Sequence, residues 1–297
     1  MSVGPDVLAG ISPADLQQLL PVFLASQVAG QSAPHVAELV SHWSESEYTS
    51  LLGTLRALGQ EHRVYPAVPH CRALARAWMS EILTTRVEHV DRLRSSMDEG
   101  RTVIVTNHVS YVDAVATDVA LFTSGNPDLA DRIVYLAGPK VYQELFRLVA
   151  AASIHSLPVP QSNQVSHTEN LAVRELARRA MSSLEAGKSA LDEGFALLFY
   201  PEGSRTRSGR LEPFLKATRR YLQAGDLVVP AVVLGTERAM PLDAPQMVPS
   251  PVSLVFGEPI RVESCESARD LLSEAHAAVS AMLPEPQRAL AESPALL

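Results

Sequence analysis

Short apolar runs alternate with helix-length segments from Gly100 onward, and this alternation constrains the fold more than any other feature of the sequence. Thr102–Thr106 is a compact β-branched run of the kind that is buried in a parallel sheet. Further short runs that are typical of strands occur at 133–136, 195–200, 228–234 and 253–256. Helical stretches, including 112–122 and 169–192, separate them. Alternation of this kind predicts an α/β fold with a mostly parallel, mixed sheet flanked by helices.

The first 95 or so residues show helical periodicity and no convincing alternating strand. Ser12, followed by Pro13 and Asp15, is a typical helix start. Serine caps the first N–H groups, proline fits the first turn, and an acid is favourable near the positive end of the helix. The sequence therefore predicts two parts, a small helical bundle at 1–95 and an α/β domain at 96–297.

The overall composition excludes several classes of protein. A formal net charge of −8 argues against general nucleic-acid binding. Cys71 and Cys265 lie far apart and match no metal spacing, so we expect reduced structural thiols and no metal. The N-terminus lacks the basic and apolar regions of a signal peptide, and apolar stretches such as 145–154 are shorter than the ~18 residues of a membrane span. We expect a soluble, cytoplasmic protein or one that contacts a membrane surface peripherally.

The segment 107–113, Asn-His-Val-Ser-Tyr-Val-Asp, follows the first predicted strand and holds a histidine and an aspartate five positions apart. On a helix, positions i and i+5 lie ~140° apart, and on a strand they face opposite sides. His108 and Asp113 can therefore meet only across a turn, which a loop at 107–110 followed by a helix would supply. Asp113 would then accept a hydrogen bond from one imidazole nitrogen and leave the other free as a general base. The alternative is an ordinary loop histidine beside a helix-capping aspartate.

A second polar segment, Tyr-Pro-Glu-Gly-Ser-Arg-Thr-Arg at 200–207, ends a predicted strand and carries two arginines in a glycine turn. Arginine forks suit phosphate because they offer paired donors in one plane. Gly203 permits a tight turn that brings backbone N–H groups to an anion. The solvated face of a following helix accounts for the basic residues further on, but Arg205 and Arg207 precede any helix. The segment therefore predicts a phosphate site.

These two segments resemble sequence blocks of the glycerolipid acyltransferases, the glycerol-3-phosphate and 1-acylglycerol-3-phosphate acyltransferases that make phosphatidic acid. Segment 107–113 matches their first block, His-four residues-Asp, segment 199–207 matches their third, and 229–233 resembles their fourth. The resemblance implies that His108 deprotonates the acceptor hydroxyl while Asp113 orients the imidazole and balances its charge. It also implies substrate-binding roles, chiefly toward the acceptor phosphate, for Glu202, Gly203, Ser204, Arg205, Arg207 and Lys216.

The same resemblance implies the partners of the reaction. The acceptor would be a phosphorylated or lipid-like alcohol, namely glycerol-3-phosphate or 1-acylglycerol-3-phosphate. The acyl donor would be an acyl-CoA or an acyl carrier protein thioester. Because the donor is a co-substrate, no separate cofactor is expected.

Two departures from the family pattern leave the acceptor open. The region that matches the second block, 152–159, lacks the arginine that the family uses on phosphate, and Phe-Leu-Lys-Ala stands at 214–217 where Phe-Lys-Lys-Gly is common. One alternative is therefore an acyltransferase for a specialised, unphosphorylated alcohol or amine. Another is a non-catalytic protein that binds lipid or an acyl carrier. The tripeptide at 235–237, Gly-Thr-Glu, is also open, as a lining of the cleft or as a simple turn.

Overall fold

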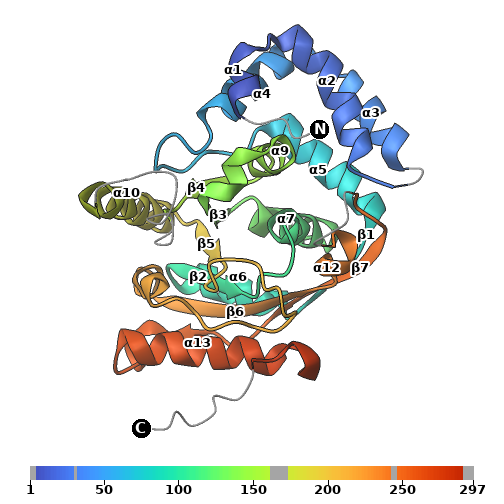
Figure 1. Cartoon of the computed structure of the whole chain (residues 1–297). Coiled ribbons are helices and arrows are strands. Elements are labelled where there is room, and N and C mark those ends of the chain that lie inside the picture. Colours follow the sequence, from blue (N-terminus) through green and yellow to red (C-terminus); the bar gives the residue numbers. More distant parts are fainter. Residues whose placement is uncertain (1–4, 30–31, 161–172, 242–245, 290–297) are drawn as a thin grey trace.

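A computed structural model describes residues 5–29, 32–160, 173–241 and 246–289 of the chain. It confirms the predicted fold class, because an eight-stranded mixed sheet lies between layers of helices (Figure 1). Five of the seven strand pairings are parallel, and the β6–β7 and β6–β8 pairs are antiparallel. The spatial order is β1-β7-β6-β2-β5-β3-β4, with β8 paired to β6. The strands are β1 Leu83–Glu88, β2 Thr102–Thr106, β3 Ile133–Ala137, β4 His155–Pro158, β5 Ala196–Phe199, β6 Leu227–Leu234, β7 Ser250–Phe256 and β8 Ile260–Arg261.

Helices cover both faces of the sheet because the strands are apolar on both sides. Val103 and Val105 of β2 face one side, where they join an apolar core with residues of α10, α11 and α13. Ile104 faces the other side and packs in a core with α6, α7 and α8. Figure 1 shows α13 beneath the sheet and α7 above it. These helices are α6 Val90–Glu99, α7 Asp113–Thr123, α8 Pro127–Ala130, α10 Val173–Asp192, α11 Arg219–Leu222 and α13 Ala268–Met282.

The N-terminal helices form a further layer outside α7, as the upper part of Figure 1 shows. Their apolar residues share one core with α7 and with α9 Leu145–Ala152. The helix start that the sequence predicted at Ser12 is confirmed, with a capping box between Ser12 and Asp15. The helices of this layer are α1 Pro5–Gly10, α2 Pro13–Ser26, α3 Ser32–Ser41, α4 Glu45–Ala57 and α5 Pro69–Ile82.

Three strands were not predicted: β1, β4 and the two-residue strand β8, which pairs with β6. Strand β1 lies inside the segment that the sequence analysis described as helical, and it pairs in parallel with β7. Strand β4 pairs with β3 at the other edge of the sheet. Strands β1 and β4 are short edge strands, and β1 is only partly buried, so neither shows the continuous apolar run of a central strand. The domain boundary at residues 95 and 96 stays a prediction. Strand β1 of the sheet lies before this boundary, and helix α6 spans it. Of the helix predicted at 169–192, residues 169–172 lie outside the described residues.

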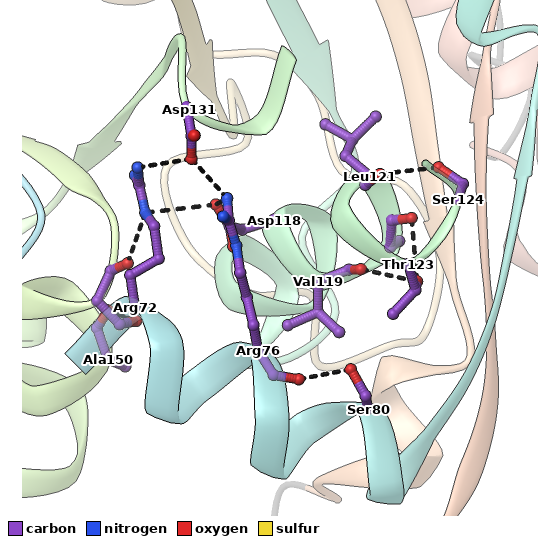
Figure 2. A network of polar contacts seen from close by, with 12 residues as sticks. Arg72, Arg76, Ser80, Asp118, Val119, Leu121, Thr123, Ser124, Asp131 and Ala150 are labelled. Carbon is purple, nitrogen blue, oxygen red and sulfur yellow. Dashed lines mark hydrogen bonds and ion pairs between the residues drawn. The ribbon is translucent and has the colours of Figure 1, made fainter. Parts of the chain in front are cut away.

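A buried ionic network joins the N-terminal layer to the helices on the sheet (Figure 2). Arg76 of α5 binds Asp118 of α7 through Nε at 2.8 Å and Asp131 through Nη2 at 2.7 Å. Arg72 reaches the same oxygen of Asp131 at 3.0 Å. Burial raises the pKa of Asp118, and the hydrogen bonds from Arg76 counter that rise. The network therefore anchors α7, the helix whose first residue is Asp113.

Candidate active site

Three loops that follow adjacent parallel strands form the candidate site. Strand β2 lies between β6 and β5 and runs parallel to both, so the carboxyl ends of the three strands meet at one edge of the sheet. Sites in parallel sheets form at this edge. The loop after β2 carries His108, the loop after β5 carries Glu202 and Arg205, and α12 Thr236–Ala239 begins two residues after β6 ends.

The predicted contact between His108 and Asp113 is confirmed. The chain leaves β2, turns through 107–112 and enters α7 with Asp113 as the first helical residue. The Nδ1 atom of His108 lies 2.8 Å from Oδ2 of Asp113. Because a carboxylate accepts, Nδ1 carries the proton in this pair and Nε2 keeps its lone pair. Asp113 is fully buried, whereas the His108 side chain is 19% exposed, so the imidazole can meet a ligand.

Four hydrogen bonds hold the Asp113 carboxylate. Its Oδ2 atom accepts the backbone N–H groups of Val109 at 2.9 Å and Ser110 at 3.0 Å in addition to His108. Its Oδ1 atom accepts the hydroxyl of Thr236 at 2.5 Å. The carboxylate also lies in the first turn of α7, near the positive end of the helix dipole. The buried charge is therefore well satisfied, and its orientation toward His108 is over-determined.

The loop that carries His108 is tied to both neighbouring strands. The side-chain amide of Asn107 exchanges two hydrogen bonds of 2.9 Å with the backbone of Val233 in β6. Glu202, after β5, accepts the backbone N–H of His108 at 2.7 Å and that of Glu212 at 2.9 Å. Burial raises the pKa of Glu202 to about 7, although these two N–H groups favour its ionised form. Both carboxyl oxygens of Glu202 are thus engaged in shaping the loops.

Tyr200 supports the imidazole from the β5 side. The two rings stack with centroids 4.2 Å apart and an interplanar angle of 19°. The hydroxyl of Tyr200 is buried and, within the described part of the chain, has no hydrogen-bond partner. Burial, with the nearby charge of Asp113, raises the pKa of Tyr200 well above its ordinary value, so the phenol stays neutral. The aromatic face, and not the hydroxyl, is what this residue contributes to the site.

Arg205 reaches the first loop through an aromatic ring. Its guanidinium carbon lies 3.3 Å from the centroid of Tyr111, a cation–π contact. A second arginine, Arg147 of α9, lies over the same ring at 4.6 Å. In the described part of the chain Arg205 forms no ion pair, so its charge is available to an anionic ligand. Gly203 has a positive φ of 73° and donates its N–H to the carbonyl of Tyr200 at 3.0 Å, so it shapes the turn that carries Arg205.

The structure brings only some of the predicted residues to the histidine. His108, Asp113, Glu202 and Arg205 are joined through the contacts above. Three further predicted substrate-binding residues lie exposed on the loop, without a hydrogen bond or ion pair to the described residues of the site: Ser204, Arg207 and Lys216. Their roles stay predictions.

Three residues of the site were missed or left open by sequence reasoning. Thr236 belongs to the tripeptide that was open between a turn and the cleft, and its bond to Asp113 places it at the site. Tyr200 carried no signal beyond its place at a strand end. Arg147 did carry one, because it is an arginine inside one of the most apolar stretches of the chain, 145–154.

The part of the chain that the structure describes contains neither a candidate metal centre nor a candidate membrane span. His, Cys, Asp and Glu side chains do not gather there in groups of three or more that could hold a metal ion. Nor does any helix in that part combine the length and the apolar character that a membrane crossing needs.

The chain resembles known acyltransferases over much of its length. The family model described as Acyltransferase matches residues 84–234, about half of the chain. A 1-acyl-sn-glycerol-3-phosphate acyltransferase from Cocos nucifera is 25% identical over 199 residues, which cover 66% of this chain and 58% of the relative. A protein of the same description from Limnanthes douglasii is 25% identical over 193 residues, or 64% of this chain and 62% of the relative. The matched region therefore spans about three fifths of the length of these relatives.

The chain is also similar to a solved structure over most of its length. The 1-acyl-sn-glycerophosphate (LPA) acyltransferase PlsC from Thermotoga maritima covers 90% of this chain, and this chain covers 90% of it. The sequence identity is 14% and the TM-score is 0.49.

Proposed function

The chain belongs to the Acyltransferase family, and from that premise we propose that it moves a fatty acyl group from a thioester to the hydroxyl of a phosphorylated glycerol acceptor. The donor is the thioester of an acyl-CoA or an acyl carrier protein. The acceptor is glycerol-3-phosphate or 1-acylglycerol-3-phosphate. The observation that carries the proposal is the 2.8 Å contact between Nδ1 of His108 and the buried carboxylate of Asp113. Among the described residues Nε2 has no hydrogen-bond partner, and the imidazole side chain is 19% exposed.

The proposed reaction uses His108 first as a base and then as an acid. Nε2 takes the proton of the acceptor hydroxyl as the oxygen attacks the carbonyl carbon of the thioester. The tetrahedral adduct collapses, the carbon–sulfur bond breaks, and the thiol leaves with the proton that His108 returns. Asp113 holds the imidazole in the required tautomer and offsets its positive charge during transfer. The hydrogen bonds from Val109, Ser110 and Thr236 support this role, because they fix the carboxylate in place.

Arg205 is the proposed anchor for the acceptor phosphate. It projects from the loop after β5 toward the loop that carries His108, and its guanidinium lies against Tyr111. The planar fork of arginine binds phosphate through two parallel hydrogen bonds. Arg207 and Lys216 would add positive charge at the mouth of the site, where both are exposed. A lipid-like acceptor implies contact with a membrane surface, and we propose that this contact is peripheral.

A panel of acceptors tests the proposal. Thiol release from an acyl-CoA and from an acyl carrier protein is followed with glycerol-3-phosphate, 1-acylglycerol-3-phosphate and an unphosphorylated monoacylglycerol. Wild type should turn over with a phosphorylated acceptor, and His108→Ala should be slower by ~100- to 10,000-fold, the usual cost of losing a general base. Preference for the unphosphorylated acceptor would favour the specialised-acceptor alternative, which the absence of an arginine from 152–159 suggests. Thioester or lipid binding without any turnover would favour the non-catalytic alternative.

A further inference from the structure

We propose that Arg147 is a second specificity-determining residue for the acceptor phosphate, working with Arg205 across the ring of Tyr111. This inference rests on the proposed function and names a residue that neither the motifs nor the family pattern indicated. It makes α9 part of the substrate site, although the sequence marks that helix as an apolar core element.

Arg147 is a charged residue that is buried in a mostly apolar helix. The residue is 7% exposed and lies in a helix whose other members are mostly apolar. Its Nε atom is buried and has no hydrogen-bond partner among the residues that the structure describes. Arginine is rarely buried unless it is paired, and an unpaired buried donor is costly. A ligand that brings acceptor oxygens to this place would satisfy the donor.

The position of Arg147 points to the same ligand that Arg205 would bind. Its guanidinium carbon lies 4.6 Å from the centroid of Tyr111, and that of Arg205 lies 3.3 Å from it. Because both distances are measured to one centroid, the two carbons are at most about 8 Å apart, so a phosphate at the edge of the Tyr111 ring would lie within reach of donors from both arginines. Tyr111 belongs to the loop between His108 and Asp113, so a phosphate held there is close to the proposed base.

The carboxylate of Glu144 would compete with the acceptor phosphate for Arg147. Its carboxylate pairs with Nη2 of Arg147 at 2.5 Å, and its side chain is 53% exposed. A carboxylate and a phosphate compete for the same guanidinium donors. An arginine held by a half-exposed acid is therefore kept in position yet can exchange that partner for a ligand. Arg147 would supply from α9 the phosphate donor that the segment 152–159 lacks.

Binding of the acceptor is measured directly by calorimetry, without donor, for wild type and four variants: Arg147→Met, Arg132→Met, Glu144→Gln and Arg205→Ala. The probes are 1-acylglycerol-3-phosphate and the unphosphorylated 1-acylglycerol. Arg147→Met keeps an apolar stem of similar length and removes the charge. We expect it to weaken binding of the phosphorylated probe by about 10-fold or more, the usual effect of losing a charge-assisted bond, and to leave the unphosphorylated probe unchanged. Arg132→Met is the matched control, because Arg132 binds the carbonyl of Gly194 and makes no contact with the site residues.

Glu144→Gln supplies an independent arm if Arg147→Met does not fold. Removal of the competing carboxylate should strengthen binding of the phosphorylated probe several-fold, whereas loss of a purely structural ion pair would not. The proposal is overturned if Arg147→Met, with a wild-type melting temperature, binds the phosphorylated probe within 2-fold of wild type. It is equally overturned if Glu144→Gln weakens that binding. If wild type binds no phosphorylated probe, the proposed function itself fails. If wild type binds the probe tightly, and Arg205→Ala weakens that binding but Arg147→Met does not, only the proposal for Arg147 fails.

Discussion

Replacing Glu202 with glutamine should change how the stability of the protein depends on pH. Burial raises the pKa of Glu202 to about 7 from an ordinary value of 4.5. Between these two values the folded protein keeps a proton on this carboxyl that the unfolded chain has lost. Because the folded state binds the extra proton, the free energy of unfolding of the wild type falls as the pH rises through this window.

The magnitude follows from the width of the window. At ~1.4 kcal/mol for each pH unit, the range from 4.5 to about 7 corresponds to roughly 3 kcal/mol of unfolding free energy. Glu202→Gln cannot titrate, so the difference in stability between wild type and variant should shift by that amount. The variant also turns an amide N–H toward the backbone N–H of His108 or Glu212, which adds a cost of ~1–3 kcal/mol at every pH.

Urea unfolding at a series of pH values between 4 and 8, extrapolated linearly to zero denaturant, measures this difference. We expect Glu202→Gln to be the less stable protein at pH 4.5, and the stability difference to shift in favour of the variant by roughly 3 kcal/mol by pH 7.5, so that the gap closes or reverses. Asp226→Asn is the control whose stability difference from wild type should stay constant across this pH range, because hydrogen bonds from Arg101 lower the pKa of Asp226. That stabilisation is present above pH 3.8 and is lost as the pH falls below it. If the difference in unfolding free energy between wild type and Glu202→Gln stays constant from pH 4.5 to 8, the pKa of Glu202 is not raised in the folded protein.

Three further predictions concern the supports of the site. Tyr200→Phe keeps the ring that stacks on His108 and removes an unpaired buried hydroxyl, so melting temperature and turnover should be retained, whereas Tyr200→Ala should lower both. Asp118→Ala leaves Arg76 buried with only its half-exposed partner and should cost about 3 kcal/mol in urea unfolding; a cost below ~1 kcal/mol would show that the network is dispensable. Thr236→Val keeps the side-chain shape and removes one charge-assisted bond to the site carboxylate, so kcat should fall about 10-fold, and an unchanged kcat would exclude that bond from catalysis.

Much of the central sheet was predictable because its strands are buried on both faces. The β-branched run of β2 and the apolar run of β6 need no tertiary information to be recognised. The edge strands β1 and β4 form because a neighbour offers unpaired backbone groups, and β1 also leaves polar side chains exposed. For β1 that neighbour is distant in the sequence, since Leu83 pairs with Ser250, and no local pattern records such a pairing.

The contact between His108 and Asp113 was predictable because a separation of five excludes regular structure and demands a turn. The partners that fix the pair were not. Tyr200 and Thr236 reach it only because β5 and β6 lie on either side of β2, which is a property of the sheet order. Arg147 illustrates the reverse case, since its burial contradicts the apolar pattern of its own helix. Local rules fail at such a residue, and the failure itself marks it for a role beyond packing.

The role of His108 as the base is tested by measuring acyl transfer to a phosphorylated acceptor with wild type and with His108→Ala. Mass spectrometry of the acceptor after incubation with acyl-CoA detects the new ester, and circular dichroism confirms that the variant is folded. We expect wild type to acylate 1-acylglycerol-3-phosphate or glycerol-3-phosphate, and His108→Ala to transfer the acyl group at a rate lower by ~100-fold or more. A folded His108→Ala that retains more than about half of the wild-type rate would contradict the assignment of His108 as the base.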